Sequence, residues 1–149
     1  MEQYTVTVQV RRAITEDISC LERFMSDNSD EYKISHASWI SYTSSCQYAT
    51  FYALCEVSQK ILGVCVVMIA HQDLDIIYIL TDKQYRMKGI GRLILNHIIK
   101  DLSPRKIYID VSDKNCGAIE FYKRFGFTFI GRRKKYYVDV DALCGVKYC

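Results

Sequence analysis

Polar and apolar residues alternate near the start of the chain and then change to helical spacing. The alternation over residues 4–12 predicts a half-buried strand. Thr15 is an expected helix N-cap, and apolar residues recur after it with the period of a helix buried on one face. That helix should end within residues 27–30, where polar residues break the pattern. Residues 31–45 predict a second helix or an irregular loop.

The rest of the chain reads as strands separated by two helices. The predicted strands cover 47–57, 61–70, 74–81, 106–111, 127–136 and 142–148, and the predicted helices cover 89–102 and 115–124. Pro104 closes the first of these helices, and Gly126 is the expected C′ residue of the second. The order β-α-α-β-β-β-α-β-α-β-β predicts an α/β (α+β) fold, a mixed sheet with helices on both faces. No internal repeat or boundary divides residues 1–149, so we expect one domain.

Composition excludes several classes of protein. Half of the 149 residues are hydrophobic and a quarter are charged, as in ordinary globular domains. The longest apolar run covers residues 61–70, too short to span a bilayer, and the polar start predicts no signal peptide. Seven cysteines form no C-x-x-C pair, so we expect reduced thiols, a cytoplasmic protein and no metal site.

Positive charge is concentrated in the second half. Residues 83–149 hold 15 of the 20 Lys and Arg but only 6 of the 17 Asp and Glu. Solvated helix faces account for part of such an excess. The rest suggests a site for a polyanion, either nucleic acid or a phosphorylated cofactor.

A basic loop with two glycines follows the strand predicted at 74–81. It reads Gln-Tyr-Arg-Met-Lys-Gly-Ile-Gly-Arg over residues 84–92 and leads into a helix. Unpaired amides at a helix start bind anions, and glycine lets the backbone approach a ligand closely. The loop lacks both the dinucleotide-binding fingerprint and the P-loop pattern. The alternative is that the glycines only permit a tight turn between the strand and the helix, and that the loop binds no ligand.

A second motif lies downstream. The pattern R-x-x-G-x-G of the loop is followed, after a strand, by N-x-x-A-x-x-F-Y-x-x-x-G-F over residues 115–127. Together the two motifs resemble the GNAT superfamily of acetyl-CoA-dependent N-acetyltransferases. The opening at 10–18 is also similar to the first strand and helix of that superfamily. Residues 109–115 and 131–143 look like those of the ribosomal-protein N-terminal acetyltransferases.

The resemblance implies a mostly antiparallel sheet of six to seven strands, in which the fourth and fifth strands splay apart around acetyl-CoA. It assigns the pantetheine arm to Ile79, Leu80 and Thr81, with an oxyanion-binding N–H at Leu80 or Thr81. The pyrophosphate would rest on the basic loop. The residues assigned to that role are Arg86, Met87, Lys88, Gly89, Ile90, Gly91 and Arg92.

The resemblance also assigns the proton-transfer groups. Tyr122 would protonate the leaving thiolate, and its alternative role is that of a core aromatic. Asn115 would hydrogen-bond the pantetheine, cap the following helix, or do both. Asp110 is the expected base for the amine, unless it is a strand-end carboxylate paired with Arg or Lys. Asp75, Glu120 and the absence of any dedicated base are the alternatives.

The expected reaction is direct attack of a primary amine on acetyl-CoA in a ternary complex. The acceptor would be a protein N-terminus, a lysine or a small amine, and neither nucleic acid nor membrane is an expected partner. We expect a monomer or homodimer. A non-catalytic acyl-CoA-binding module is the alternative function. Five aromatic residues would line the acceptor pocket or pack beneath a lid: Tyr32, Trp39, Tyr42, Tyr136 and Tyr137.

Overall fold

The computed structural model describes residues 7–29, 33–137 and 139–149. The start of the first predicted strand, residues 4–6, and Tyr32 lie outside these ranges. The elements are β1 (Val8–Arg12), η1 (Thr15–Asp17), α1 (Ile18–Asn28), α2 (His36–Ser44), β2 (Tyr48–Cys55), β3 (Ile61–Ala70), β4 (Asp73–Thr81), η2 (Lys83–Tyr85), α3 (Ile90–Leu102), β5 (Lys106–Ser112), α4 (Cys116–Phe125), β6 (Thr128–Tyr137) and β7 (Val140–Tyr148). Their order agrees with the sequence prediction.

Local capping differs from the prediction at the first helix and agrees with it at the last. Thr15 does not cap α1, because residues 15–17 form a 3₁₀ turn and the Asp17 carboxylate accepts from the Ile14 N–H at 2.9 Å. The second helix is regular, with the Ser35 hydroxyl accepting from the Ser38 N–H at 3.1 Å. Gly126 ends α4 in the left-handed conformation, with φ of 110°, as expected.

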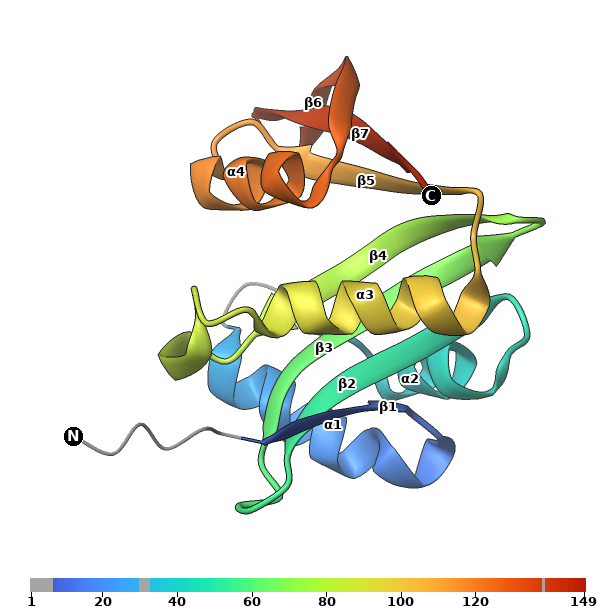
Figure 1. Cartoon of the computed structure of the whole chain (residues 1–149), viewed down its shortest axis with the longest axis vertical. Helices are drawn as coiled ribbons and strands as arrows, with labels where there is room; N and C mark the ends of the chain where they lie inside the picture. Colours follow the sequence, from blue (N-terminus) through green and yellow to red (C-terminus); the bar gives the residue numbers. More distant parts are fainter. Residues whose placement is uncertain (1–6, 30–32, 138) are drawn as a thin grey trace.

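Seven strands form one sheet within the described ranges, in the order β1-β2-β3-β4-β5-β7-β6. Among these described strands only the β4–β5 pair is parallel, and the other neighbours are antiparallel. The predicted mixed, mostly antiparallel sheet is therefore confirmed. The strands β5, β7 and β6 are neighbours at one end of the sheet, and α4 lies beside them (Figure 1).

Helices cover both faces of the sheet, also as predicted. On one face, α1 and α2 bury Leu21 and Trp39 against Val64 and Val66 of β3. On the other face, α3 and α4 bury a larger apolar cluster against β2–β5, including Ile94, Leu95, Ile98, Tyr122, Phe125, Phe51, Cys65 and Ile107. Figure 1 shows α3 along the part of the sheet formed by β2, β3 and β4, and α4 beside β5–β7.

The packing of α3 gives the first testable prediction. Ile94 is fully buried, whereas Leu93 on the same helix is 42% exposed. Ile94→Ala should lower the free energy of unfolding by about 2–5 kcal/mol, because it removes apolar contacts and leaves a cavity. Denaturant titration measures the change. Leu93→Ala is the matched control and should cost much less; equal losses in both variants would contradict this description of the core.

Candidate functional site

The strands β4 and β5 pair for only three residues and then separate. Residues 73–75 of β4 pair with 106–108 of β5, and Asp75 opposite Tyr108 is the last pair. Beyond it, residues 76–81 of β4 have no β5 partner within the described chain, and the two strands diverge (Figure 1). We call these diverging segments, residues 76–81 and 109–112, the fork. The predicted splay of the fourth and fifth strands is therefore confirmed.

A β-bulge in β4 lies where the fork opens. Tyr78 is opposite Val66 of β3 and Ile76 is opposite Val67, so that Ile77 is an extra residue in β4. A bulge bends its strand and increases the local twist. Ile77 lies two residues beyond Asp75, so the bend coincides with the end of the pairing with β5.

The fork leaves one edge of β4 available to a ligand. Ile79, Leu80 and Thr81 are half-buried and pair with β3 along the other edge. Peptide N–H and C=O groups alternate along each edge of a strand. An extended ligand could therefore hydrogen-bond to the fork side of β4 as an additional strand would.

The basic loop, residues 84–92, leads into the first turn of α3. Met87 and Gly89 both have left-handed backbones, with φ of 62° and 83°. A Cβ on Gly89 would meet nothing within 4 Å, so the surface above this residue is open. The first amides of α3 have no partner within the helix, and the helix dipole favours an anion there. The loop thus has the geometry expected for a phosphate site.

Gly91 also lies against α4. A Cβ at this position would lie 3.1 Å from the Phe121 ring, so its missing side chain makes room for contact between α3 and α4. The sequence motif holds both glycines, but only Gly89 has the open surface expected at a ligand. This contact joins two helices that are distant in sequence, so it could not be predicted from the spacing of residues within the motif.

The three cations of the loop are available to a ligand. None of the ion pairs among the described residues involves Arg86, Lys88 or Arg92. Lys88 lies 5.4 Å from the centroid of the Tyr85 ring, and Arg92 lies 5.4 Å from that of Phe125. Cation–π contacts orient these side chains without neutralising their charge.

The predicted residues of α4 lie on the α3 side of the sheet. Tyr122 is only 2% exposed, and its ring lies 5.2 Å from those of Phe121 and Phe127. It belongs to the apolar cluster that also contains Ile76 and Ile109, the residues just beyond the last β4–β5 pair. The Asn115 side chain accepts from the Ala118 N–H at 3.1 Å, so its capping role is observed.

Asp110 lies on the opposite face of the sheet from Tyr122. Its neighbours Ile109 and Val111 face the α3–α4 cluster, so Asp110 faces away from it. The Arg133 guanidinium is 3.8 Å from its carboxylate. The expected base and the expected acid are thus on different faces, with the fork between them.

Asp75 shares the face of Asp110. Burial, and next the Asp110 carboxylate, raise the pKa of Asp75, whereas Arg133 opposes the rise. From the sequence, Asp75 was only an alternative candidate for the base. The register between β4 and β5, which are distant in sequence, cannot be predicted from the sequence alone.

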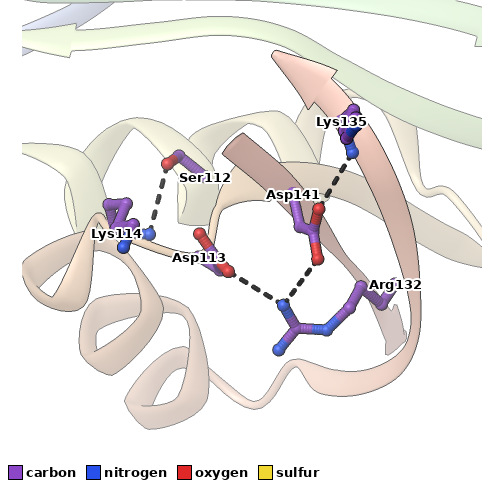
Figure 2. Close-up of polar contacts among 6 residues, drawn as sticks. All are labelled: Ser112, Asp113, Lys114, Arg132, Lys135 and Asp141. Carbon is purple, nitrogen blue, oxygen red and sulfur yellow. Dashed lines mark hydrogen bonds and ion pairs between the residues drawn. The ribbon is translucent and has the colours of Figure 1, made fainter. Parts of the chain in front are cut away.

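The run of basic residues at 132–135 is largely tied into the β6–β7 hairpin. Arg132 contacts both Asp113, at 2.8 Å, and Asp141, at 3.0 Å (Figure 2). The Asp141 carboxylate also accepts from the Lys135 N–H at 2.9 Å. Donation from Lys135, followed by that from Arg132, lowers the pKa of Asp141. Arg132 therefore links β6 to β7 through Asp141 and links this hairpin to the end of β5 through Asp113.

The expected aromatic lining is only partly accessible. Trp39 is fully buried and packs in the core between α2 and the sheet, and it also forms the floor of a hollow lined by residues of α1 and by Lys33 and Ile34. Tyr42 is half-buried, and Tyr136 is 51% exposed. The Tyr137 side chain lies outside the described part of the structure.

A cleft of about 550 Å³ lies elsewhere, between α1, the β2–β3 turn and residues 82–84. It contains none of the predicted site residues.

All seven cysteines are free. Within the described ranges, no group of three or more His, Cys, Asp or Glu is arranged to hold a metal ion, and no helix is long and apolar enough to cross a membrane.

Comparison with known proteins agrees with this geometry. The model of the "Acetyltransferase (GNAT) family" matches residues 13–127. N-alpha-acetyltransferase 50 of Danio rerio is 41% identical over 61 residues, which are 38% of this chain and 36% of that protein. A probable spermine N(1)-acetyltransferase of Bacillus subtilis subsp. natto is 39% identical over 54 residues, 34% of this chain and 36% of that protein. The matches thus span about a third of these curated relatives.

Solved structures show the same fold over nearly the whole chain. The ribosomal-protein-S18-alanine N-acetyltransferase of Escherichia coli superposes with a TM-score of 0.84 at 19% identity, covering 95% of this chain and 94% of that one. At this identity the likeness concerns the fold. The family match rests on the sequence itself and covers most of the chain, from the first helix through both motifs. The chain therefore belongs to the GNAT acetyltransferase family.

Proposed function

We propose that this chain is an acetyl-CoA-dependent N-acetyltransferase that transfers acetyl to a primary amine by direct attack in a ternary complex. The observation that carries the proposal is the fork: within the described chain, β4 pairs with β5 only as far as Asp75, and residues 76–81 of β4 continue without β5 as a neighbour. The basic loop begins just beyond the open end of β4. One extended ligand with a charged end would satisfy both features.

The residues present fit acetyl-CoA. The free edge at Ile79–Thr81 suits the amide-bearing pantetheine arm, and the open surface over Gly89 suits a pyrophosphate. Arg86, Lys88 and Arg92 supply charge that no carboxylate within the described chain neutralises. Bound acetyl-CoA would supply an acetyl thioester, which is activated toward amines.

The residues of the chain would then stabilise charge and move protons. A β4 N–H at Leu80 or Thr81 would stabilise negative charge that develops on the acetyl oxygen. Tyr122, buried on the α4 side, would give its hydroxyl proton to the departing sulfur. A carboxylate on the opposite face, Asp110 in the sequence-based assignment, would take a proton from the amine.

The acceptor class is a primary amine on a protein N-terminus, a lysine or a small molecule. The names of the relatives cover two of these: an N-alpha-acetyltransferase and a probable spermine acetyltransferase. Calorimetric titration with acetyl-CoA, with dephospho-CoA and ATP as controls, tests the cofactor directly. We expect micromolar binding selective for acetyl-CoA. No binding would overturn the proposal; binding without transfer to any amine would favour a non-catalytic acyl-CoA-binding module.

Gly89→Glu tests the phosphate site. The glutamate would place bulk and negative charge over the loop, so acetyl-CoA binding should be abolished in the same titration. Gly89→Ala is the matched control, because it imposes the same left-handed backbone strain without the charge, and its Cβ meets open space. It should retain most of the affinity. Wild-type affinity in the glutamate variant would contradict the assignment of the loop.

Tyr122→Phe tests the proton donor. The ring and its packing remain, so acetyl-CoA affinity should change little, whereas turnover should fall by about 10²–10⁴-fold. Thiol release measures turnover, and calorimetry measures affinity. Tyr148→Phe is the control, since Tyr148 is 69% exposed at the end of β7. Unchanged turnover in Tyr122→Phe would remove Tyr122 as the acid and leave it as a core aromatic.

A further inference from the structure

Two buried polar side chains converge on the turn of residues 82–85, which joins β4 to the basic loop. Besides Thr50 in β2, the buried polar residues of the described chain are Asn28, which is 6% exposed, and Asp82, which is 4% exposed. Asn28 is the last residue of α1, and Asp82 directly follows β4. Burial of a polar side chain is costly unless its hydrogen bonds are made, so the partners of these two residues are informative.

Asp82 holds the 82–85 turn in one conformation. One oxygen of its carboxylate accepts from the Gln84 N–H at 2.8 Å, and the other lies 3.3 Å from Nζ of Lys60, in the β2–β3 turn. The Asp82 backbone N–H donates to the Leu62 carbonyl at 2.8 Å, and its own carbonyl accepts from the Tyr85 N–H at 2.9 Å. These contacts join the turn to β3 and close it into η2.

Asn28 joins the same turn to α1. Its side-chain oxygen accepts from the Lys83 N–H at 3.0 Å, and its side-chain nitrogen donates to the Phe24 carbonyl, also at 3.0 Å. The side chain is therefore fixed by its own helix while it holds the turn. Because α1 covers the face of the sheet opposite α3, Asn28 holds the turn from the layer that does not contain the proposed phosphate site.

Tyr85 connects the turn to a cation of the basic loop. The centroid of its ring lies 5.8 Å from Lys60 Nζ and 5.4 Å from Lys88 Nζ. Cation–π attraction orients both ammonium groups around this ring. Since Lys60 also contacts Asp82, the position of Lys88 depends on the contacts that hold the turn.

We propose that Asp82 and Asn28 are positioning residues for acetyl-CoA: they fix the 82–85 turn so that the fork side of β4 and the basic loop can bind one ligand at the same time. This rests on the proposed N-acetyltransferase function. The turn lies between Thr81, the end of the segment assigned to the pantetheine arm, and Arg86, the first cation assigned to the pyrophosphate.

The physical reason is the entropy of the turn. A mobile turn would have to be ordered when the two ends of the cofactor bind together, and that ordering would weaken binding. Hydrogen bonds made before the cofactor arrives remove most of this cost. Neither Asp82 nor Asn28 needs to contact the cofactor for this effect, because each acts through the backbone N–H that it binds.

Asp82→Ala tests the carboxylate. The substitution leaves the Gln84 N–H without its partner, so the turn should lose its fixed conformation. We expect the calorimetric Kd for acetyl-CoA to rise by about tenfold or more. With spermine and a short peptide with a free N-terminus as probe amines, kcat at saturating acetyl-CoA should change by less than about threefold, because binding and not chemistry is affected. A wild-type Kd in Asp82→Ala would overturn the proposal.

Asp82→Asn is the conservative variant. Its side-chain oxygen can still accept from the Gln84 N–H, whereas the charge beside Lys60 is lost. The Lys60 side chain is half exposed, so water can solvate it and the ion pair should contribute little. Asp82→Asn should therefore keep Kd within about threefold of the wild type, since asparagine serves as well as aspartate at such a cap. A rise as large as that in Asp82→Ala would overturn the assignment of this hydrogen bond.

Asn28→Ala and Thr50→Val separate positioning from a general loss of stability. Asn28→Ala removes the acceptor of the Lys83 N–H, and Kd for acetyl-CoA should rise by about fivefold or more. Thr50 is 1% exposed, and its hydroxyl donates to the Tyr42 carbonyl of α2 at 2.9 Å. Thr50→Val should lower the denaturation midpoint but leave Kd unchanged. An equal rise of Kd in both variants would show that affinity follows stability alone, and would overturn the proposal.

Hydrogen exchange gives a readout that needs no cofactor. In the free wild-type protein the amides of Lys83 and Gln84 should be protected, because both donate to buried side-chain oxygens. Protection of the Gln84 amide should be lost in Asp82→Ala and kept in Asp82→Asn. Fast exchange of both amides in the wild type would overturn the proposal. Failure of the wild type to bind acetyl-CoA would instead overturn the proposed function itself.

Discussion

The extra residue in β4 determines how the two parts of the sheet meet. The bulge at Ile77 lies two residues beyond Asp75 and Tyr108, the last parallel pair of β4 and β5, and a bulge bends its strand and increases its twist. Within the described chain, backbone groups of Ile79, Leu80 and Thr81 on the side of β4 away from β3 have no β5 partner. Because such groups are costly to bury alone, they require water or a ligand chain as partner. The fork is therefore both a structural irregularity and the origin of the proposed binding site.

The chemistry follows from the faces that the fork separates. Tyr122 and the basic loop belong to the side covered by α3 and α4, while Asp75 and Asp110 occupy the other side. A donor that enters along α3 and an acceptor that approaches from the carboxylate side would meet between the strands. Each proton-transfer group would then contact only its own substrate.

Much of the fold could be predicted because its signals are local. The alternating and helical patterns located most strands and helices to within a few residues, and Gly126 adopts the left-handed backbone expected of a C′ residue. The second helix, left open as a helix or a loop over residues 31–45, is the regular helix His36–Ser44. What the sequence did not reveal depends on tertiary contacts: the bulge at Ile77, the fit of Phe121 against Gly91, and the burial of Trp39. Thr15 is not the cap of α1 because residues 15–17 form a 3₁₀ turn and α1 begins only after Asp17.

Hydrogen exchange along β4 tests the fork most directly. If the free edge binds the extended arm of acetyl-CoA, amides on that edge within residues 79–81 should exchange fast in the free protein and become protected at saturating acetyl-CoA. The amides of the same strand that pair with β3 should be protected in both states. Binding of acetyl-CoA with no change at residues 79–81 would show that the cofactor lies elsewhere and would contradict the account.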